Sequence, residues 1–354
     1  MRNTLFFPLI LISSAIQAQN LPLNLEWSAF LPYGSDERPS TRVCIDGPNT
    51  AWLLEDDLMM ELTTGDGVVR RYDPNGLPLD DYPYISFGCG SLDAPIDLFV
   101  RNDSVWILMY WQLISGDQEM KYCLRTPGGE YSPATIPEPD LHQAAMDLYV
   151  EGTYCTISAS YDSTTTVEHQ RLTMVDLNGT VIWDMIYPTG QFNGFSALEG
   201  VAGGDLLVAD FPELHWFSSS DGDIVWTISV YSGAPTRRGD VKIWNNEIYW
   251  AATEGTTIHY GRTAFDGTPI WSDAIASSDI SKLTVDPQGR MWLVGAYGGQ
   301  GVLNVIGADG IPIGTWNYGA VLSDIAAGNS NITITGALSN TSPDSFVVTG
   351  TPDL

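Results

Sequence analysis

Residues 176–187 read DLNGTVIWDMIY, and close copies return as SSDGDIVWTISV from Ser219 and as AFDGTPIWSDAI from Ala264. Each copy has a polar residue before a glycine, as in tight hairpin turns that need a positive φ: Asn178-Gly179, Asp221-Gly222 and Asp266-Gly267. A tryptophan stands four residues after each glycine: Trp183, Trp226 and Trp271. The pattern predicts a turn followed by a short strand, three times over.

The predicted strands are apolar on both faces. Side chains alternate along a strand, so the tryptophan lies on one face and the residue before it lies on the other: Ile182, Val225 and Ile270. Two apolar faces are typical of a strand whose sheet is covered on both sides. We therefore expect these sheets to be packed between two neighbouring sheets.

The turn glycine recurs along the chain at intervals of 40 to 53 residues, at Gly76, Gly129, Gly179, Gly222, Gly267, Gly310 and Gly350. A second landmark, a strand that opens after a polar turn, keeps the same order, as at Trp52, Trp106 and Trp292. A period in the forties with several short strands per unit is typical of a β-propeller with four-stranded blades. The seven turns predict seven blades.

The two ends of the chain complement each other. Only TPDL follows Gly350, so the last blade lacks its outer strand, while Trp27 lies in a strand-like segment that no turn precedes. We expect residues 21–32 to supply the missing strand, since this would remove exposed sheet edges and hold both chain ends. The predicted fold is an all-β, seven-bladed β-propeller closed by its N-terminal strand.

The phrases LTVDPQGRMWLVGAY, SPDSFVVTGT and LEWSAFLPYGSDE resemble the repeats of secreted bacterial β-propellers of the SBBP type. The DG-x-x-x-W turns resemble pyrroloquinoline-quinone-type (PQQ-like) propeller repeats. The resemblance spans nearly the whole mature chain and implies a fold, not a reaction. Quinone-binding enzymes of that wider group use a vicinal cysteine pair, which this sequence lacks, so we expect no quinone.

The first residues, MRNTLFFPLILISSAIQAQN, have a basic start, a short apolar run and small residues that end at Ala18. This is the pattern of a secretory signal peptide, and the apolar run is far shorter than the ~20 residues of a membrane span. We expect residues 1–18 to be a signal peptide and residues 19–354 to be a single propeller domain, exported to the periplasm or the extracellular space.

The sequence is acidic, with 43 Asp and Glu residues against 15 Lys and Arg and a net charge of −28. Such a charge repels phosphate backbones and anionic headgroups. We therefore expect no nucleic-acid partner and no membrane insertion, and we expect a monomer. Cations, neutral sugars, peptides and basic proteins remain as partners.

Four cysteines fall in the first half of the chain, and none forms a C-x-x-C pair. In an exported protein an even number of cysteines is compatible with disulfides. Local pairing would join Cys123 to Cys155 and Cys44 to Cys89, and four buried free thiols are an equally good interpretation.

No catalytic motif is present: no G-x-S-x-G, H-E-x-x-H, Walker-type Gly-Lys-Ser/Thr or D-x-D-x-D-G loop. His169, His215 and His259 each fall in the third strand of a blade, so we do not expect them to converge on a metal. Acidic clusters at residues 55–57 and 80–81 could bind calcium, although solvated acidic turns are favoured. We assign no catalytic residue, no metal ligand and no cofactor, with a divalent cation such as calcium as the open alternative.

Long predicted connections gather on one face of the propeller, where recognition usually resides. They carry aromatic rings beside polar groups, as a sugar or peptide site requires: Tyr33, Asp36, Arg38, Tyr84, Trp111, His142, Tyr161, Phe192, Arg237, Arg238 and Tyr297. The competing interpretation is that these aromatics only hold the loops down. The sequence favours a non-enzymatic propeller that binds a protein or glycan here. The alternative is a lyase- or lactonase-type enzyme that uses acids of these loops, His142 and a divalent cation.

Overall fold

The computed structural model describes most of the chain, and in that part every regular element is a β-strand. The described residues are 22–31, 42–46, 50–58, 65–80, 92–101, 104–112, 118–125, 131–135, 142–151, 154–163, 167–176, 180–188, 190–201, 204–236, 238–276, 279–297, 300–337 and 345–354. None of these residues forms a helix that could cross a membrane. The predicted signal peptide lies outside them.

The described strands form seven four-stranded antiparallel sheets. Six sheets follow chain order: β2 (Arg42–Asp46), β3 (Thr50–Leu58), β4 (Gly65–Tyr72), β5 (Pro78–Asp80); β6 (Leu92–Arg101), β7 (Ser104–Gln112), β8 (Gln118–Arg125), β9 (Tyr131–Thr135); β10 (His142–Glu151), β11 (Tyr154–Ser163), β12 (Val167–Asp176), β13 (Val181–Tyr187); β14 (Ala197–Gly200), β15 (Leu206–Asp210), β16 (Glu213–Phe217), β17 (Ile224–Ser229); β18 (Gly239–Trp244), β19 (Glu247–Glu254), β20 (Thr257–Ala264), β21 (Pro269–Ala276); β22 (Asp279–Val285), β23 (Met291–Tyr297), β24 (Gln300–Ile306), β25 (Pro312–Tyr318). The remaining sheet combines both ends of the chain: β26 (Val321–Ala327), β27 (Ile332–Ala337), β28 (Ser345–Pro352) and β1 (Leu23–Leu31).

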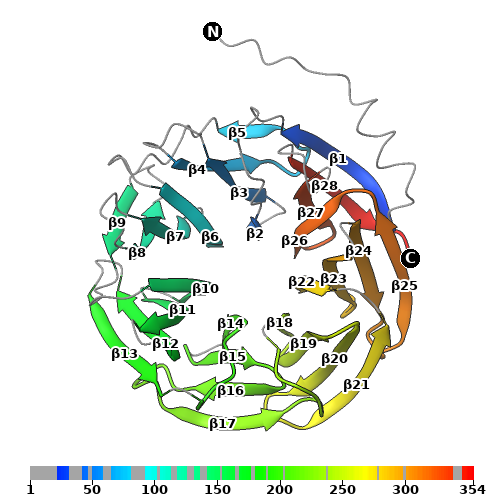
Figure 1. Cartoon of the computed structure of the whole chain (residues 1–354). Helices are drawn as coiled ribbons and strands as arrows, with labels where there is room; N and C mark the ends of the chain where they lie inside the picture. Colours follow the sequence, from blue (N-terminus) through cyan, green and yellow to red (C-terminus); the bar gives the residue numbers. More distant parts are fainter. Residues whose placement is uncertain are drawn as a thin grey trace.

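The sheets are arranged around a central axis, with the first strand of each sheet innermost and the fourth outermost (Figure 1). Neighbouring first strands contact each other, and β2 contacts both β6 and β26. The apolar clusters lie between sheets rather than within one. Leu207 of β15, for example, shares a buried cluster with Ile248 and Trp250 of β19.

At several boundaries between neighbouring sheets, the tryptophan of one sheet lies over the turn glycine of the next to form a joint, whereas Gly267 is met by Ile228 instead. Trp183 of β13 lies over Gly222, which is in the turn before β17, and a Cβ added at Gly222 would come within 3.2 Å of the indole. Trp271 of β21 lies in the same way over Gly310, at 2.8 Å from a Cβ built there. The turn of the next sheet also accepts the indole N–H, since Trp183 Nε1 donates to Ser219 O at 2.8 Å. A glycine is needed at these turns both for its positive φ and for the space that the indole fills.

The same joint connects β1 to the first sheet. β1 pairs antiparallel with β28, so that Trp27 is opposite Thr349. Its indole lies over Gly76, where an added Cβ would come within 2.5 Å, and stacks on Tyr72 with 5.4 Å between ring centroids.

Buried aspartates join the first strands near the axis. Asp240 of β18 accepts the N–H of Leu283 on β22 at 2.8 Å. Asp324 of β26 accepts the N–H of Val43 on β2 at 2.9 Å. Each carboxylate also accepts the N–H of the residue that follows it. The pKa of Asp324 is raised from its ordinary value because the carboxyl is buried. The charges of Arg42 and Lys282 and the two backbone donors oppose this shift without cancelling it.

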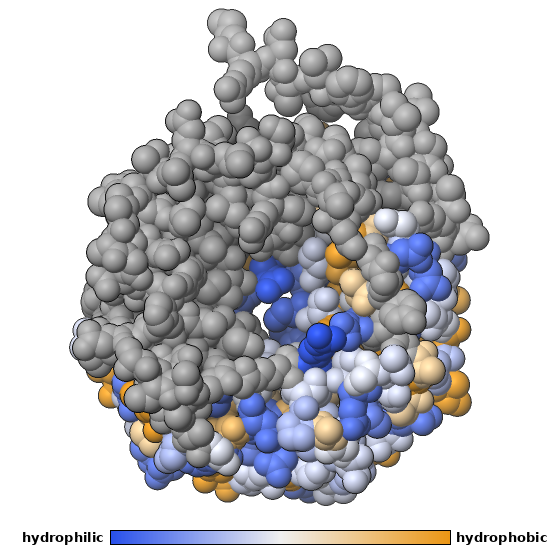
Figure 2. Space-filling view, in the orientation of Figure 1, coloured by the Kyte–Doolittle hydropathy of each residue, from blue (hydrophilic) through white to orange (hydrophobic). Residues whose placement is uncertain are grey.

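Only one face of the outermost strands is buried, so the prediction that both of their apolar faces are covered is wrong. Ile182, Val225 and Ile270 are 47%, 58% and 44% exposed, whereas Trp183 on the other face is buried. The physical reason is that sheets that radiate from an axis diverge outward, so the outermost strand contacts a neighbour on one side only. Figure 2 shows some of this apolar surface along the outer edge and hydrophilic residues beside the central opening.

Candidate functional site

The connections of the antiparallel sheets alternate between two faces. One face carries the turns between second and third strands and the connections from each fourth strand to the next sheet. We call it the long-loop face. Two long connections of this face are described except for one residue each: connection 188–196, between β13 and β14, without residue 189, and connection 230–238, between β17 and β18, without residue 237.

Several predicted binding residues lie on strand ends at this face. Trp111, Tyr161 and Tyr297 lie near the ends of second strands, and His142 begins a first strand. Five others lie outside the described residues: Tyr33, Asp36, Arg38, Tyr84 and Arg237. Of the cysteines, Cys44 lies on β2, Cys123 on β8 and Cys155 on β11, while Cys89 is outside the described part, so both disulfides stay predictions.

Phe192 anchors the connection 188–196. Its ring meets Tyr187 edge-on at 4.9 Å between centroids, and it lies 5.0 Å from Phe195 and 4.8 Å from the imidazole of His215. Phe192 is half-buried in this aromatic cluster. Its observed contacts therefore hold the loop in place.

The connection 230–238 is anchored in a similar way. Tyr231 stacks on His259 with 4.4 Å between centroids and an interplanar angle of 3°. Ala234 N donates to Glu254 Oε1 at 2.7 Å, and Glu254 also pairs with His259. Burial, with help from the charge of Glu254, raises the pKa of Tyr231 to about 12. Arg238, an exposed predicted binding residue, pairs with Asp279 at 2.5 Å.

The β15–β16 hairpin lies between these two connections and is bonded to both. Its turn is Phe211-Pro212, whose peptide bond is cis. The turn carbonyls accept N–H groups from the second connection, Pro212 O from Val230 at 2.9 Å and Phe211 O from Thr236 at 3.2 Å. On the other side, Asp210 accepts the backbone N–H groups of residues 193 and 194. The hairpin thus fixes both loops relative to each other.

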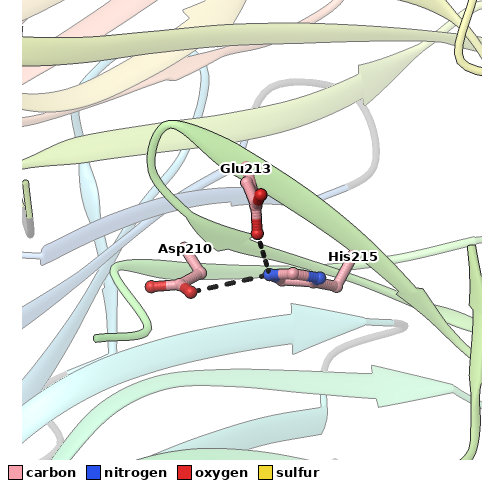
Figure 3. A group of neighbouring side chains, drawn as sticks. All are labelled: Asp210, Glu213 and His215. Carbon is pink, nitrogen blue, oxygen red and sulfur yellow. Dashed lines mark ion pairs between the residues drawn. The ribbon is translucent and has the colours of Figure 1, made fainter. Parts of the chain in front are cut away.

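Three ionisable side chains meet on this hairpin: Asp210, Glu213 and His215 (Figure 3). His215 Nε2 lies 3.6 Å from Asp210 Oδ2 and 3.8 Å from Glu213 Oε2. The side chains of His215 and Asp210 are 3% and 1% exposed, while that of Glu213 is 43% exposed and reaches solvent. Two carboxylates and an imidazole within 4.8 Å of one another are a ligand set for a divalent cation.

The cluster was not among the predicted sites, although the sequence contains a signal for it. His169, His215 and His259 were not expected to converge on a metal, because each falls in the third strand of a blade. Residues 210–215 read DFPELH. In a hairpin with a two-residue turn, Asp210 pairs with Glu213, and His215 lies two residues further along the same face. The spacing therefore places all three side chains together.

A cavity of about 340 Å³ lies at the centre, lined by residues of β2, β6, β14, β18, β22 and β26. Its lining is mixed in charge, and Lys242 Nζ pairs with Glu199 Oε2 at 2.7 Å. Lys282 and Asp324 also line this cavity. The described lining thus carries charges of both signs, with Asp97, Glu199 and Asp324 beside Lys242 and Lys282, and not a field of a single sign that would select an ion.

The similarity to one solved structure at a TM-score above 0.5 supports the fold. No protein-family model matches the chain, and a search of curated proteins finds no match. Among solved structures, a catalytically inactive virginiamycin B lyase from Staphylococcus aureus with quinupristin is similar at a TM-score of 0.59 and 12% identity, over 92% of this chain and 99% of that one. BamB from Moraxella catarrhalis has a TM-score of 0.44 and 10% identity, over 92% of this chain and 99% of that one. The Dos1 propeller matches at 0.48 and 10% identity, over 90% and 95%. The protein is a β-propeller.

Proposed function

We propose that the protein is an exported, non-enzymatic, seven-bladed β-propeller that binds a protein or glycan through its long-loop face. The observation that carries this proposal is the bonding of connections 188–196 and 230–238 to the β15–β16 turn. Loops that are already ordered lose little conformational entropy when they bind, so more of the interaction free energy appears as affinity. Ordered long loops on a rigid scaffold are typical of recognition surfaces.

The seven-bladed, closed architecture is part of the proposal. Its support is the pairing of β1 with β28, together with two contacts between the last and first sheets. These contacts are Trp27 over Gly76 and the bond from Val43 N to Asp324. Both repeat contacts that join other neighbouring sheets. We also propose that the repeats are of the secreted SBBP or PQQ-like type.

Export and charge restrict the partner. Removal of the proposed signal peptide, residues 1–18, takes Arg2 away and leaves a net charge of −29. A partner that is neutral or basic meets no long-range repulsion from such a surface. A neutral glycan or a basic protein segment is therefore the expected ligand class.

A screen of the mature chain against glycans, peptides and surface proteins tests the proposal. Gln191 and Ser232 are exposed on the two connections, so the double variant Gln191→Lys/Ser232→Lys should weaken binding at least about tenfold. A matched control, Thr180→Lys/Thr268→Lys, makes the same charge change in turns of the opposite face and should leave binding unchanged. Equal loss in both variants, no loss in the first, or no binder at all would refute the proposal.

The alternative is a propeller enzyme of the lyase or lactonase type that uses acids of the long-loop face and a divalent cation. One observation favours it, the meeting of Asp210, Glu213 and His215 on this face. Turnover of an ester, lactone or acidic sugar polymer that a chelator abolishes and added metal restores would support the enzyme. Binding that a chelator leaves unchanged, without turnover, would support the binding module.

A further inference from the structure

We propose that Asp210, Glu213 and His215 form a binding site for a divalent transition-metal ion of the zinc type. The site goes beyond the proposed binding function and does not depend on it, because the argument rests on the hairpin alone. Three observations support it: the ligand geometry, the surroundings of the imidazole and the support of the carboxylates.

The ligand atoms have the spacing of a metal site that needs only a small contraction. Zn²⁺ with bonds of about 2.1 Å in tetrahedral geometry separates its ligand atoms by roughly 3.4 Å. His215 Nε2 lies 3.6 Å from Asp210 Oδ2 and 3.8 Å from Glu213 Oε2. For these two pairs the contraction is a few tenths of an ångström, and the two carboxylate oxygens lie within 4.8 Å of each other.

The imidazole nitrogen is buried and directed into the cluster. The side chain of His215 is only 3% exposed. Within the described part of the chain its Nε2 has no hydrogen-bond partner. Figure 3 shows the ring with Nε2 turned toward both carboxylates. A buried nitrogen without a hydrogen bond is costly, and a cation between it and the two anions would satisfy all three groups.

The other imidazole nitrogen has the partner that metal-ligating histidines usually have. His215 Nδ1 lies 2.9 Å from Thr227 Oγ1. When Nδ1–H donates to this hydroxyl, Nε2 presents its lone pair to the cluster, which is the tautomer a metal requires. Without a cation, that lone pair would face two negative charges.

The buried carboxylate is oriented before any ion binds. Asp210 Oδ1 accepts the N–H of Gly194 at 2.7 Å and that of Asn193 at 2.9 Å. Asn193 also donates to Oδ2, from its backbone N–H at 3.0 Å and its side-chain amide at 3.5 Å, so the carboxylate is held at both oxygens while Oδ2 lies 3.6 Å from His215 Nε2. Such outer contacts orient metal ligands and raise metal affinity.

The donor set selects the class of metal. Calcium prefers six to eight oxygen ligands, whereas one imidazole with two carboxylates suits zinc and similar ions. Among the described residues three side chains can supply ligands, and Glu213 is 43% exposed, so a fourth coordination position on its side would take water or a ligand group of the partner.

The test measures Zn²⁺ binding to the mature chain after treatment with a chelator, by equilibrium dialysis and calorimetry, with Ca²⁺ as the competing ion. We expect one Zn²⁺ per chain, a higher thermal midpoint with Zn²⁺, and no displacement by equimolar Ca²⁺. Glu213→Gln should weaken binding at least about tenfold. The matched control is Glu254→Gln, since Glu254 also pairs with a histidine, His259, on the next sheet, but within the described residues this pair belongs to no group of three metal-ligating side chains.

A second measurement needs no variant of the site. The chain has four histidines, so its ¹⁵N spectrum contains few imidazole signals and each can be followed separately. Zn²⁺ should shift the Nε2 signal of one of them. That signal should persist in His259→Gln. The proposal is overturned if the chelator-treated chain binds no Zn²⁺, if Glu213→Gln binds as tightly as wild type, if Ca²⁺ competes equally, or if His215 only takes up a proton. Partner binding is measured separately, so its failure leaves this result interpretable.

Discussion

Gly76→Ala tests the joint on which the repeat depends. Gly76 has a φ of +78°, and a Cβ built there would lie 2.5 Å from Cγ of Trp27 and 2.8 Å from its Cβ. Trp27 is 7% exposed and stacks on Tyr72, so it has little room to withdraw. The variant should therefore force β1 away from the first sheet.

Two terms set the size of the effect. A left-handed φ destabilises an L-residue by about 1–2 kcal/mol. Overpacking in a filled site adds about 1–3 kcal/mol. We therefore expect a loss of about 2–5 kcal/mol in the free energy of unfolding, a large part of the stability of a typical domain.

Gly190→Ala is the matched control. Gly190 has a φ of +80°, but no atom lies within 4 Å of a Cβ built there, so only the backbone term of about 1–2 kcal/mol applies. Urea unfolding of the mature chain measures both variants, and a double-mutant cycle with Trp27→Ala isolates the clash. If Gly76→Ala costs no more than Gly190→Ala, or if the penalty is unchanged in the Trp27→Ala background, the joint is not what holds these sheets together.

Three further outcomes are expected. Asp324→Asn should destabilise the chain by about 1–3 kcal/mol, because an amide has one acceptor oxygen for the two backbone N–H groups, and the stability gap to wild type should narrow as the pH rises above the ordinary aspartate pKa of 3.8. The sign follows from burial, which raises the pKa of Asp324 in the folded protein. The stability that a raised pKa contributes is present at low pH and is lost as the pH rises through the pKa of the folded state. A difference in stability between the variant and wild type that stays constant with pH would contradict this. Peptide mapping of the unreduced exported protein should find two disulfides, and other linkages or free thiols would refute the pairing: Cys123 with Cys155 and Cys44 with Cys89. N-terminal sequencing of the exported protein should begin at Gln19, and an intact Met1 would exclude cleavage there.

Much of the fold could be predicted because each repeat marks its turn and its outer strand with two residue types at a fixed spacing. Gly267 is in a turn with a positive φ, and Trp271, four residues later, packs on the turn glycine of the next sheet, Gly310. The exposure of Ile182 could not be predicted in the same way, because periodicity says which face a side chain is on and not how far the next sheet lies from it.

The candidate site was harder to predict than the fold. Phe192 was correctly placed on a long connection, but its contact with His215 depends on how that loop folds back over the hairpin. The position of His215 in a third strand separates it from the other histidines but not from the acids of its own hairpin. Asp210 and Glu213 become its neighbours through strand pairing, so the cluster follows from register, which the residue types alone do not give.

The indole-on-glycine contact also bears on how such a chain can change during evolution. A duplicated segment of forty-odd residues would bring its own tryptophan and its own turn glycine, so both new boundaries would match the old ones without further substitutions. Loss of a whole segment would likewise leave compatible surfaces on either side. The circumference can thus vary by recombination while the joints stay the same, and the loops remain free to diverge.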